Sequence, residues 1–315
     1  DHFPCFFLPH MIEKTAERLQ VKMELVDSNG LLPLNAAPKT YLRAVDFRRF
    51  LQKSLKPHLL EMPAVDPLKG LHLPHLPEKL PEYKRWKPGV EFDLESLPEP
   101  GVVESRGGFQ RADKLVTRFL DERLKHYDQR SEPSLQVASG FSRYLHWGHL
   151  SAHQIFQELC DQEDFEVENW RVKTPGSKEG GWGMSANADS FLDELITWRE
   201  LGYNMCHREK DYESYESLPD WARQTLEDHA QDPRDHHYTL KQLDEGKTYD
   251  PIWNAAQRQL REEGYMHNYM RMLWGKKILE WSSSPRQAVK NLIELNNKYS
   301  LDGRNPNSYS GIFWC

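Results

Sequence analysis

The sequence has little of what a membrane protein, a disulfide-rich protein or a metal protein would need. No apolar run approaches the roughly 20 residues of a membrane-spanning helix, and the first residues lack the basic and then apolar pattern of a signal peptide. Four cysteines are scattered without Cys-x-x-Cys spacing, which predicts free thiols rather than a zinc site or a disulfide framework. His236-His237 has no further ligands at ligand spacing, so we predict no metal site. These absences favour a globular, cytoplasmic protein without a membrane span.

The sequence also lacks an excess of positive charge, because 48 acidic residues outnumber 41 Lys and Arg residues. The net charge of −7 excludes a chain that is basic throughout, so nucleic acid could bind only at a local patch. Residues 106–130 form one such candidate patch, because this segment contains seven basic and only four acidic residues. A solvated helix face explains the same pattern, and both readings stay open.

The 315 residues fall into three parts of different composition. Residues 1–62 look like the tail of an α/β unit, with a strand at 21–26 and helices on either side of it. Residues 63–105 hold eight prolines and should form an extended linker that apolar side chains hold to the surface: Leu71, Leu73, Leu76 and Trp86. Residues 106–315 have helical periodicity. A parallel sheet needs more strands than one, so we expect earlier strands of the α/β unit to lie outside this sequence.

The segment 266–281 is the most informative stretch of the helical part. Its apolar residues recur in steps of four and three and predict one buried helix face, made of Met266, Met270, Trp274, Ile278 and Trp281. His267 and Arg271 fall within the same sector, so both should be buried. A buried guanidinium without a partner is costly, which requires either a structural salt bridge or an anionic or polar ligand beside Arg271.

Polar residues also occur on the apolar faces, or at the starts, of other predicted helices. Glu194 lies at the edge of an apolar helix stripe, so its carboxylate is either paired structurally or functional. Asn296 falls on the core face of a helix that starts at Ser284-Pro285, and its amide needs a hydrogen-bond partner. Ser139-Gly140-Phe141-Ser142 leads into another helix and offers N–H and hydroxyl donors to an anion.

Tryptophan is unusually frequent, with ten residues, most of them in the second half. A large helical core explains them, although rings held close together could also pass electrons or stack on bases. Trp274 and Trp281 are seven residues apart, which places them on one helix face about 10 Å apart along the axis. That separation is short enough for an electron to hop between the rings.

Five blocks of the chain together resemble the class II cyclobutane pyrimidine dimer DNA photolyases of the photolyase/cryptochrome family. They are residues 139–148, 193–201, 253–255, 266–281 and 295–314, in the family's order, and the similarity spans about residues 105–315. Met-His-Asn-x-x-Arg-Met followed by two tryptophans seven apart is a specific pattern. The resemblance implies a mainly α fold, in which a helical FAD-binding photolyase domain (106–315) follows the remnant of an α/β, Rossmann-like antenna domain (1–62).

The resemblance also implies which residues would hold a U-shaped FAD. The cofactor-binding set would be Tyr127, Ser139, Gly140, Phe141, Ser142, Leu145, Asn268, Arg271, Asn296 and Asp302. Within it, Asp302 would pair with Arg271, and Asn296 would face flavin N5. Arg271 would thereby receive the anion that its burial requires.

For the reaction, the resemblance implies light-driven repair of pyrimidine dimers in double-stranded DNA by a monomeric lyase, cytoplasmic or, in a bacterium, associated with the nucleoid. Glu194 would hydrogen-bond the dimer, and Trp274, Trp253 and Trp281 would form, from the inside outward, the chain that reduces the flavin. With Asn296 these are the predicted catalytic residues. The dimer pocket would be lined by Arg130, Trp198, Tyr269, Met272 and Trp314.

Three features depart from the family pattern. Ser131 follows Arg130 where the family usually has asparagine, residues 161–188 look like an insertion, and members continue beyond the position of Cys315, so we expect a fragment. Two alternatives to repair are a cryptochrome-like flavin photoreceptor with the same fold and a cofactor-free helical scaffold with a tryptophan-rich core. A repair assay under light tests the first alternative, and a visible spectrum tests the second.

Overall fold

The computed structural model describes residues 2–64, 66–73, 75 and 103–315, and within these ranges it is helical, with no strand. The predicted mainly α fold is confirmed. The α-helices are α1 (Leu8–Ala16), α2 (Ala44–Ser54), α3 (Lys56–Leu59), α4 (Phe109–Arg118), α5 (Ser142–His146), α6 (Ala152–Gln162), α7 (Ala186–Leu192), α8 (Arg199–Arg208), α9 (Asp220–Asp228), α10 (Leu240–Asp244), α11 (Pro251–Glu263), α12 (Asn268–Trp281), α13 (Pro285–Tyr299) and α14 (Pro306–Trp314). None of the described helices is long and apolar enough to cross a bilayer.

Shorter helical turns connect or extend these helices. Two are π-helical: Phe119–Arg123, which continues α4, and Asp193–Trp198, which joins α7 to α8. The 3₁₀ turns are Leu34–Ala36, Leu124–Gln129, Pro133–Leu135, Val167–Asn169 and Tyr215–Ser217. π-Turns inside helices are rare and are frequent at functional sites, and the second of these carries Glu194.

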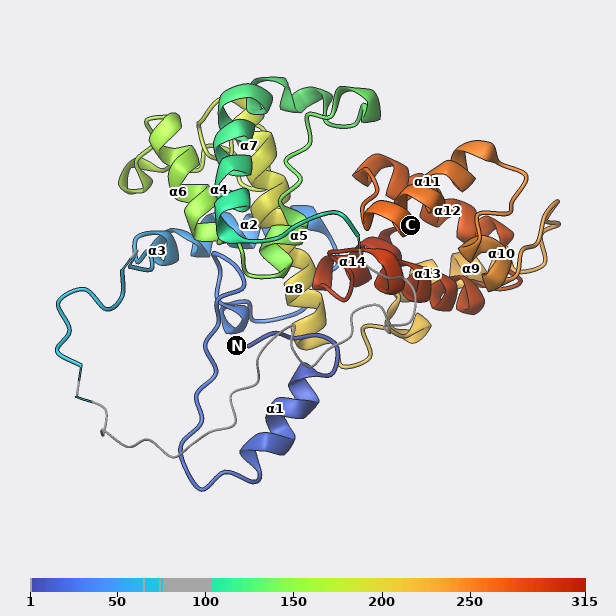
Figure 1. Ribbon diagram of the computed structural model, residues 1–315, viewed down its shortest axis with the longest axis horizontal. Helices are drawn as coiled ribbons and strands as arrows, with labels where there is room; N and C mark the ends of the chain where they lie inside the picture. Colours follow the sequence, from blue (N-terminus) through green and yellow to red (C-terminus); the bar gives the residue numbers. More distant parts are fainter. Residues whose placement is uncertain (1, 65, 74, 76–102) are drawn as a thin grey trace.

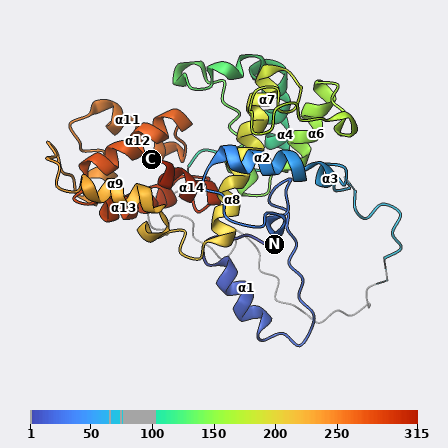
Figure 2. The ribbon, with the colours of Figure 1, turned by 180° about the vertical axis from the view of Figure 1, so that it is seen from behind.

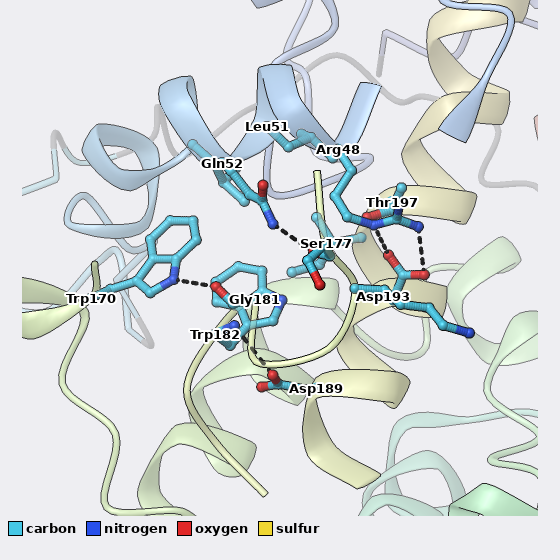
Figure 3. A pocket seen from close by; sticks show the side chains of 13 residues that line it. Arg48, Leu51, Gln52, Trp170, Ser177, Gly181, Trp182, Asp189, Asp193 and Thr197 are labelled. Atoms are coloured by element: carbon cyan, nitrogen blue, oxygen red, sulfur yellow. Dashed lines mark hydrogen bonds and ion pairs between the residues drawn. The ribbon is translucent and has the colours of Figure 1, made fainter. Parts of the chain in front are cut away.

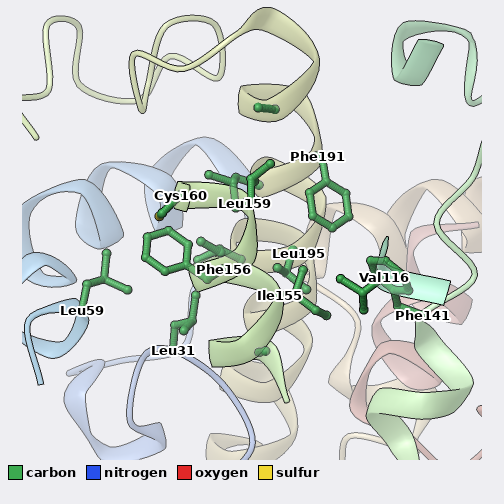
Figure 4. Packing of buried hydrophobic residues seen from close by; sticks show 14 of the residues in the cluster. Leu31, Leu59, Val116, Phe141, Ile155, Phe156, Leu159, Cys160, Phe191 and Leu195 are labelled. Atoms are coloured by element: carbon green, nitrogen blue, oxygen red, sulfur yellow. The ribbon is translucent and has the colours of Figure 1, made fainter. Parts of the chain in front are cut away.

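The helices form two groups with separate cores, and α8 and α14 lie between them (Figures 1 and 2). The first core is built by α2, α4, α6 and α7, and Figure 4 shows its side chains, among them Ile155, Phe156 and Phe191. The second core is built by α11, α12 and α13. Burying each large apolar side chain contributes about 1.5–3 kcal/mol, so each group has its own source of stability.

Glycine permits the close contact between α8 and α14 that links the two groups. A Cβ at Gly202 would lie 2.7 Å from Asn307 Oδ1 and 2.8 Å from Ser310 Oγ. Asn305 caps α14, because its side chain accepts from the Asn307 N–H at 3.1 Å. The predicted helix start at Ser284-Pro285 is confirmed in the same way, with Ser284 Oγ accepting from the N–H of Gln287.

The helix predicted over 266–281 begins two residues later than expected. α12 starts at Asn268, and His267 is its N-cap, with Nδ1 accepting from the Tyr269 N–H at 3.2 Å. Histidine is not among the usual N-cap residues, so nothing in the sequence indicated that the helix starts after His267. The apolar pattern alone therefore placed the start of the helix too early. Met270 is only partly buried, whereas the other four residues of the predicted apolar stripe are buried.

The strand predicted at 21–26 is absent. Val21 and Val26 are exposed, and the segment has no regular secondary structure, although the Val26 carbonyl accepts from the N–H of His2 at 2.8 Å. Alternating apolar residues form a strand only beside a partner strand, and the described residues provide none. The helices expected on either side are present as α1 and α2.

Most of the predicted linker, including Leu76 and Trp86, lies outside the described residues. Leu71 and Leu73, at its described edge, are largely exposed, so the prediction that they hold the segment to the surface is wrong. Isolated apolar side chains on an extended segment find too few neighbours to be buried. The division into three domains stays a prediction.

The stretch between α6 and α7, which looks like an insertion in the sequence, is attached to the first group of helices (Figure 3). Trp170 stacks on Trp182 with ring centroids 4.4 Å apart, and its Nε1 donates to the Gly181 carbonyl at 2.9 Å. Arg48 of α2 donates from Nη1 to the Gly176 carbonyl at 3.2 Å. The loop therefore extends the first core instead of standing free.

Glu200 of α8 anchors the N-terminal segment. Its carboxylate accepts from the N–H groups of Leu31 and Leu32 at 2.6 and 3.0 Å, and a Cβ at Gly30 would lie 2.7 Å from Oε1. Burial raises the pKa of this carboxyl to about 7, against the opposing effects of Arg199 and the two N–H donors. The folded protein therefore holds the Glu200 proton more tightly than the unfolded chain does. The protonated carboxyl makes its whole contribution to the free energy of unfolding below the ordinary pKa of 4.5, and this contribution is lost as pH rises to about 7.

Glu200→Gln should therefore remove part of the pH dependence of stability. Between the two pKa values of Glu200, 4.5 and about 7, deprotonation of this carboxyl should lower the parent's free energy of unfolding by on the order of 3 kcal/mol. The variant has no carboxyl at this position and should not show this decrease. Denaturant unfolding at about pH 5 and about pH 8 measures the difference. The exposed Glu227→Gln is the matched control, and an equal fall in both variants would contradict the assignment.

Candidate functional site

Arg271 and Asp302 form the centre of the site. Arg271 of α12 donates from Nη1 to Asp302 Oδ1 at 3.1 Å and from Nη2 to Ser300 Oγ at 3.2 Å. Ser300 donates to Asp302 at 2.5 Å, and Ser142 of α5 hydrogen-bonds the same carboxylate. The predicted pair is present, and the hydrogen bond from Ser142 connects it to α5.

The charge state of Asp302 follows from these contacts. Burial alone would raise its pKa, but the Arg271 guanidinium and the two serine hydroxyls outweigh burial and hold the pKa at about 2. Gly303 lets the loop close on itself, because a Cβ there would lie 2.9 Å from the Ser300 carbonyl oxygen. Arg271 keeps one unused donor, since its buried Nε has no partner among the described residues. An unpaired buried donor is costly, which points to a ligand beside it.

Three further residues near this pair were missed by the sequence prediction: Arg123, Arg143 and Tyr265. Burial raises the pKa of Tyr265, and Arg271, Arg143 and Arg123, which all lie close enough to act on its phenol, lower it. Arg143 donates to Ser105 Oγ at 3.1 Å, and its buried Nε has no partner among the described residues. Three guanidiniums and one carboxylate, that of Asp302, therefore lie near the Tyr265 phenol, and this excess of positive charge suits a phosphate group. The sequence signals for this were the positive charge of 106–130, which includes Arg123, and the anion-site pattern of 139–142, which precedes Arg143.

The predicted cofactor residues before α5 pack on the first core. Tyr127 and Phe141 are buried, with ring centroids 5.7 and 5.1 Å from that of Phe119. Gly140 has a φ of +73°, a conformation that favours glycine. Phe141 is the N-cap residue of α5, and no side chain caps this helix start. Ser139 and Leu145 are half-buried.

The asparagines of the predicted set differ in their surroundings. Asn296 of α13 is 3% exposed, and its Nδ2 donates to Asn297 Oδ1 at 3.3 Å. The prediction that an amide faces the core is therefore confirmed. Asn268 is exposed in the first turn of α12.

Three buried tryptophans form a continuous row in the second core. The rings of Trp274 and Trp253 are nearly parallel, at 4°, with centroids 6.3 Å apart, and Trp253 meets Trp281 edge to face at 5.4 Å. Trp253 Nε1 donates to the Trp274 carbonyl at 3.1 Å, and Trp274 Nε1 donates to Gln257 Oε1 at 2.9 Å. The rings touch in the predicted order, with Trp253 in the middle.

Glu194 is paired with Arg130. Arg130 Nη2 donates to Glu194 Oε1 at 3.0 Å, and the guanidinium lies over the Tyr127 ring, 5.0 Å from its centroid. Burial raises the pKa of Glu194, whereas Arg130 lowers it. This half-buried ion pair agrees with the alternative that the Glu194 carboxylate is paired structurally. It also brings together Arg130 and Glu194, the two charged residues predicted to contact the dimer.

The aromatic residues of the predicted pocket are only partly brought together. Trp198, which ends the second π-turn, meets Trp314 of α14 edge to face, with centroids 5.0 Å apart. Trp314 and Tyr269 are exposed, and Met272 is half-buried on α12. Within the described chain, the Tyr269 ring makes no ring contact with either tryptophan.

Comparison with known proteins first gives the class of domain. Residues 191–278, from α7 to α12, match the family model for the FAD binding domain of DNA photolyase. Similar curated proteins include deoxyribodipyrimidine photo-lyases of Oryza sativa subsp. japonica, 36% identical over 309 residues, and Methanothermobacter thermautotrophicus, 33% identical over 311 residues. These alignments cover 93% and 96% of this chain. The chain belongs to the photolyase/cryptochrome family.

The chain spans 55% and 62% of the length of those two relatives. A bacterial class III photolyase from Agrobacterium tumefaciens, known from its crystal structure, is similar with a TM-score of 0.63 and 19% identity. The match covers 97% of this chain and 57% of that one. At this identity the likeness concerns the fold alone.

Proposed function

We propose that this chain binds FAD and takes part in the light-driven repair of cyclobutane pyrimidine dimers in DNA, in the manner of the class II photolyases that its sequence resembles. One observation carries the proposal. The row of three touching tryptophans begins at Trp274, about one helical turn after Arg271, whose buried Nε lacks a partner among the described residues. An electron path and a vacant donor on neighbouring turns of α12 suit a redox cofactor.

The donors present fit FAD. Arg271, oriented by Asp302, would donate to the flavin ring, while Arg143 and Arg123 would bind the diphosphate. Asn296 would face flavin N5, where an amide can donate or accept. When bound, FAD supplies the chromophore and the electron that splits the cyclobutane ring and afterwards returns.

The chain's own residues would do the remaining work. Trp274, Trp253 and Trp281 would pass electrons inward to keep the cofactor reduced. Trp198, Tyr269, Met272 and Trp314 would receive a dimer flipped out of the duplex, which is cheap for a damaged base pair. Glu194, held by Arg130, would hydrogen-bond the pyrimidine where negative charge develops.

The purified protein under blue light tests the proposal. We expect a bound-flavin absorption spectrum and loss of cyclobutane dimers from an irradiated duplex oligonucleotide, with binding that weakens as salt rises. A protein without visible absorption would contradict cofactor binding. A flavin that is photoreduced while the dimers remain intact would instead favour the photoreceptor alternative.

Glu194→Ala should lower the repair yield per absorbed photon by about tenfold while leaving most of the flavin bound, because the carboxyl acts on charge that develops only in the dimer. Repair yield and flavin content are measured on the same preparation. Glu122→Ala, which removes an exposed carboxylate paired with Arg118, is the control. Loss of flavin in the Glu194 variant alone would show that this carboxylate is structural.

A further inference from the structure

The tryptophan row does not end at the protein surface. Trp281 is only 1% exposed, so a reductant in solution cannot contact the ring of the outermost tryptophan. Its ring instead meets two tyrosines edge to face, with centroid distances of 5.3 Å to Tyr238 and 5.7 Å to Tyr249. Tyr249, just before the N-cap of α11, is 54% exposed. The aromatic contacts therefore continue from Trp281 to solvent through Tyr249.

The three tryptophans also have no way to release a proton. An oxidised indole is a cation until it loses its Nε1 proton. Trp253 and Trp274 donate that N–H to a backbone carbonyl and to the Gln257 amide, neither of which accepts a proton near neutral pH. Trp281 Nε1 is buried and has no partner among the described residues. A positive charge on the row would thus stay in a buried environment, where it is unfavourable.

The surroundings of Trp281 favour moving this charge outward. The Lys277 ammonium lies 5.6 Å from the Trp281 ring centroid, although Glu280, at 2.8 Å from that ammonium, partly offsets it. Tyr249 stacks on the His236 ring with centroids 4.1 Å apart, which fixes the phenol at the edge of Trp281. Because an oxidised phenol that has lost its proton is neutral, oxidation of Tyr249 leaves no charge behind.

Tyr238 is less suited to the same role. Its hydroxyl accepts from the Tyr249 backbone N–H at 2.9 Å, and its ring is only half-exposed. The two tyrosines touch the same tryptophan, so they can be compared directly by substitution.

We propose that Tyr249 is the terminal electron donor of the tryptophan row. This inference rests on the proposed function, because a photoexcited oxidised flavin is the oxidant. Trp274 would give one electron to the flavin and would be refilled through Trp253 and Trp281, and Tyr249 would give one electron to oxidised Trp281. The Tyr249 hydroxyl proton leaves to water, and an external thiol later returns one electron and one proton to the tyrosyl radical.

The test is electron paramagnetic resonance of the flavin-loaded chain after a light pulse, with ring-deuterated tyrosine to identify the radical. The parent and the control Tyr41→Phe should give a tyrosyl signal whose width depends on the label. Tyr249→Phe should give a tryptophanyl signal that decays severalfold faster, and thiol-supported photoreduction should fall severalfold. Tyr249→Trp should restore the photoreduction yield, because an exposed indole can lose its proton to water.

An unchanged tyrosyl signal in Tyr249→Phe, or its loss only in Tyr238→Phe, would overturn the inference while leaving the row intact. No protein radical in a flavin-loaded parent would overturn the row itself, and with it the proposed electron supply. Flavin content and thermal midpoint are recorded for each variant, and equal values exclude misfolding as the cause of a lost signal.

Discussion

Trp274→Phe should abolish photoreduction of bound oxidised flavin while leaving repair by chemically reduced flavin unaffected. Trp274 is the first ring of the row and contacts the next one in parallel, 6.3 Å away. Phenylalanine keeps an aromatic ring at that place but is far harder to oxidise than an indole. The substitution also leaves the buried Gln257 carbonyl without its donor, so we expect a loss of about 1–3 kcal/mol in the free energy of unfolding.

Absorption spectra during illumination with a thiol measure this effect. Trp221→Phe, at an exposed position on α9, is the matched control and should behave as the parent. Undiminished photoreduction in the Trp274 variant would show that electrons reach the cofactor by another route.

Asp302→Asn should empty the site of most of its flavin and destabilise the protein. The substitution removes the charge partner of Arg271, whose guanidinium is only partly buried, contrary to the sequence prediction, and would then lack an anion. Breaking such a pair costs about 3 kcal/mol, and the unpaired guanidinium would no longer be held in place. Flavin content after gel filtration and denaturant unfolding measure the two effects. Asp232→Asn, which removes an exposed partner of His229, is the control and should change neither.

The same carboxylate predicts the behaviour in acid. Folding lowers the pKa of Asp302 from 3.8 to about 2. The ionised carboxylate therefore adds to the free energy of unfolding above about pH 4, and this contribution is lost as pH falls toward 2. The parent should therefore lose stability and flavin in this range. Asp302→Asn should lack this component, and an identical acid profile in both proteins would place the effect on another group.

The features that the sequence predicts best are those that depend on helical periodicity and on the need of inward-facing polar groups for partners. The inner face of α12 follows from its spacing. The position of Arg271 on that face predicted that its guanidinium needs an anion, whereas the choice of Asp302 as that anion came only from the family resemblance. The N-terminal segment shows the limit, because residues 21–26 have a strand pattern but no partner strand within the described chain. Local pattern cannot supply that partner.

Other parts of the site depend on contacts between distant segments. Arg143 and Arg123 lie on different elements and act together only because both approach Tyr265. Their separate positions in the sequence suggest ordinary surface residues. Likewise, the cap on α12 comes from an imidazole, whose role depends on the turn before the helix.

The bonds that connect the two helix groups have a consequence for the cell. Besides the packing of α8 on α14, Ser142 reaches Asp302, the Trp147 indole donates to the Leu301 carbonyl at 2.8 Å, and Asn305 meets His146 at 3.1 Å. A cofactor held by Arg143 on one side and Arg271 on the other would add its binding energy to this junction and shift the folding equilibrium. Riboflavin supply during synthesis should thus govern how much of the newly made chain escapes proteolysis, and a flavin-starved cell should contain less of this protein, not merely an inactive form of it.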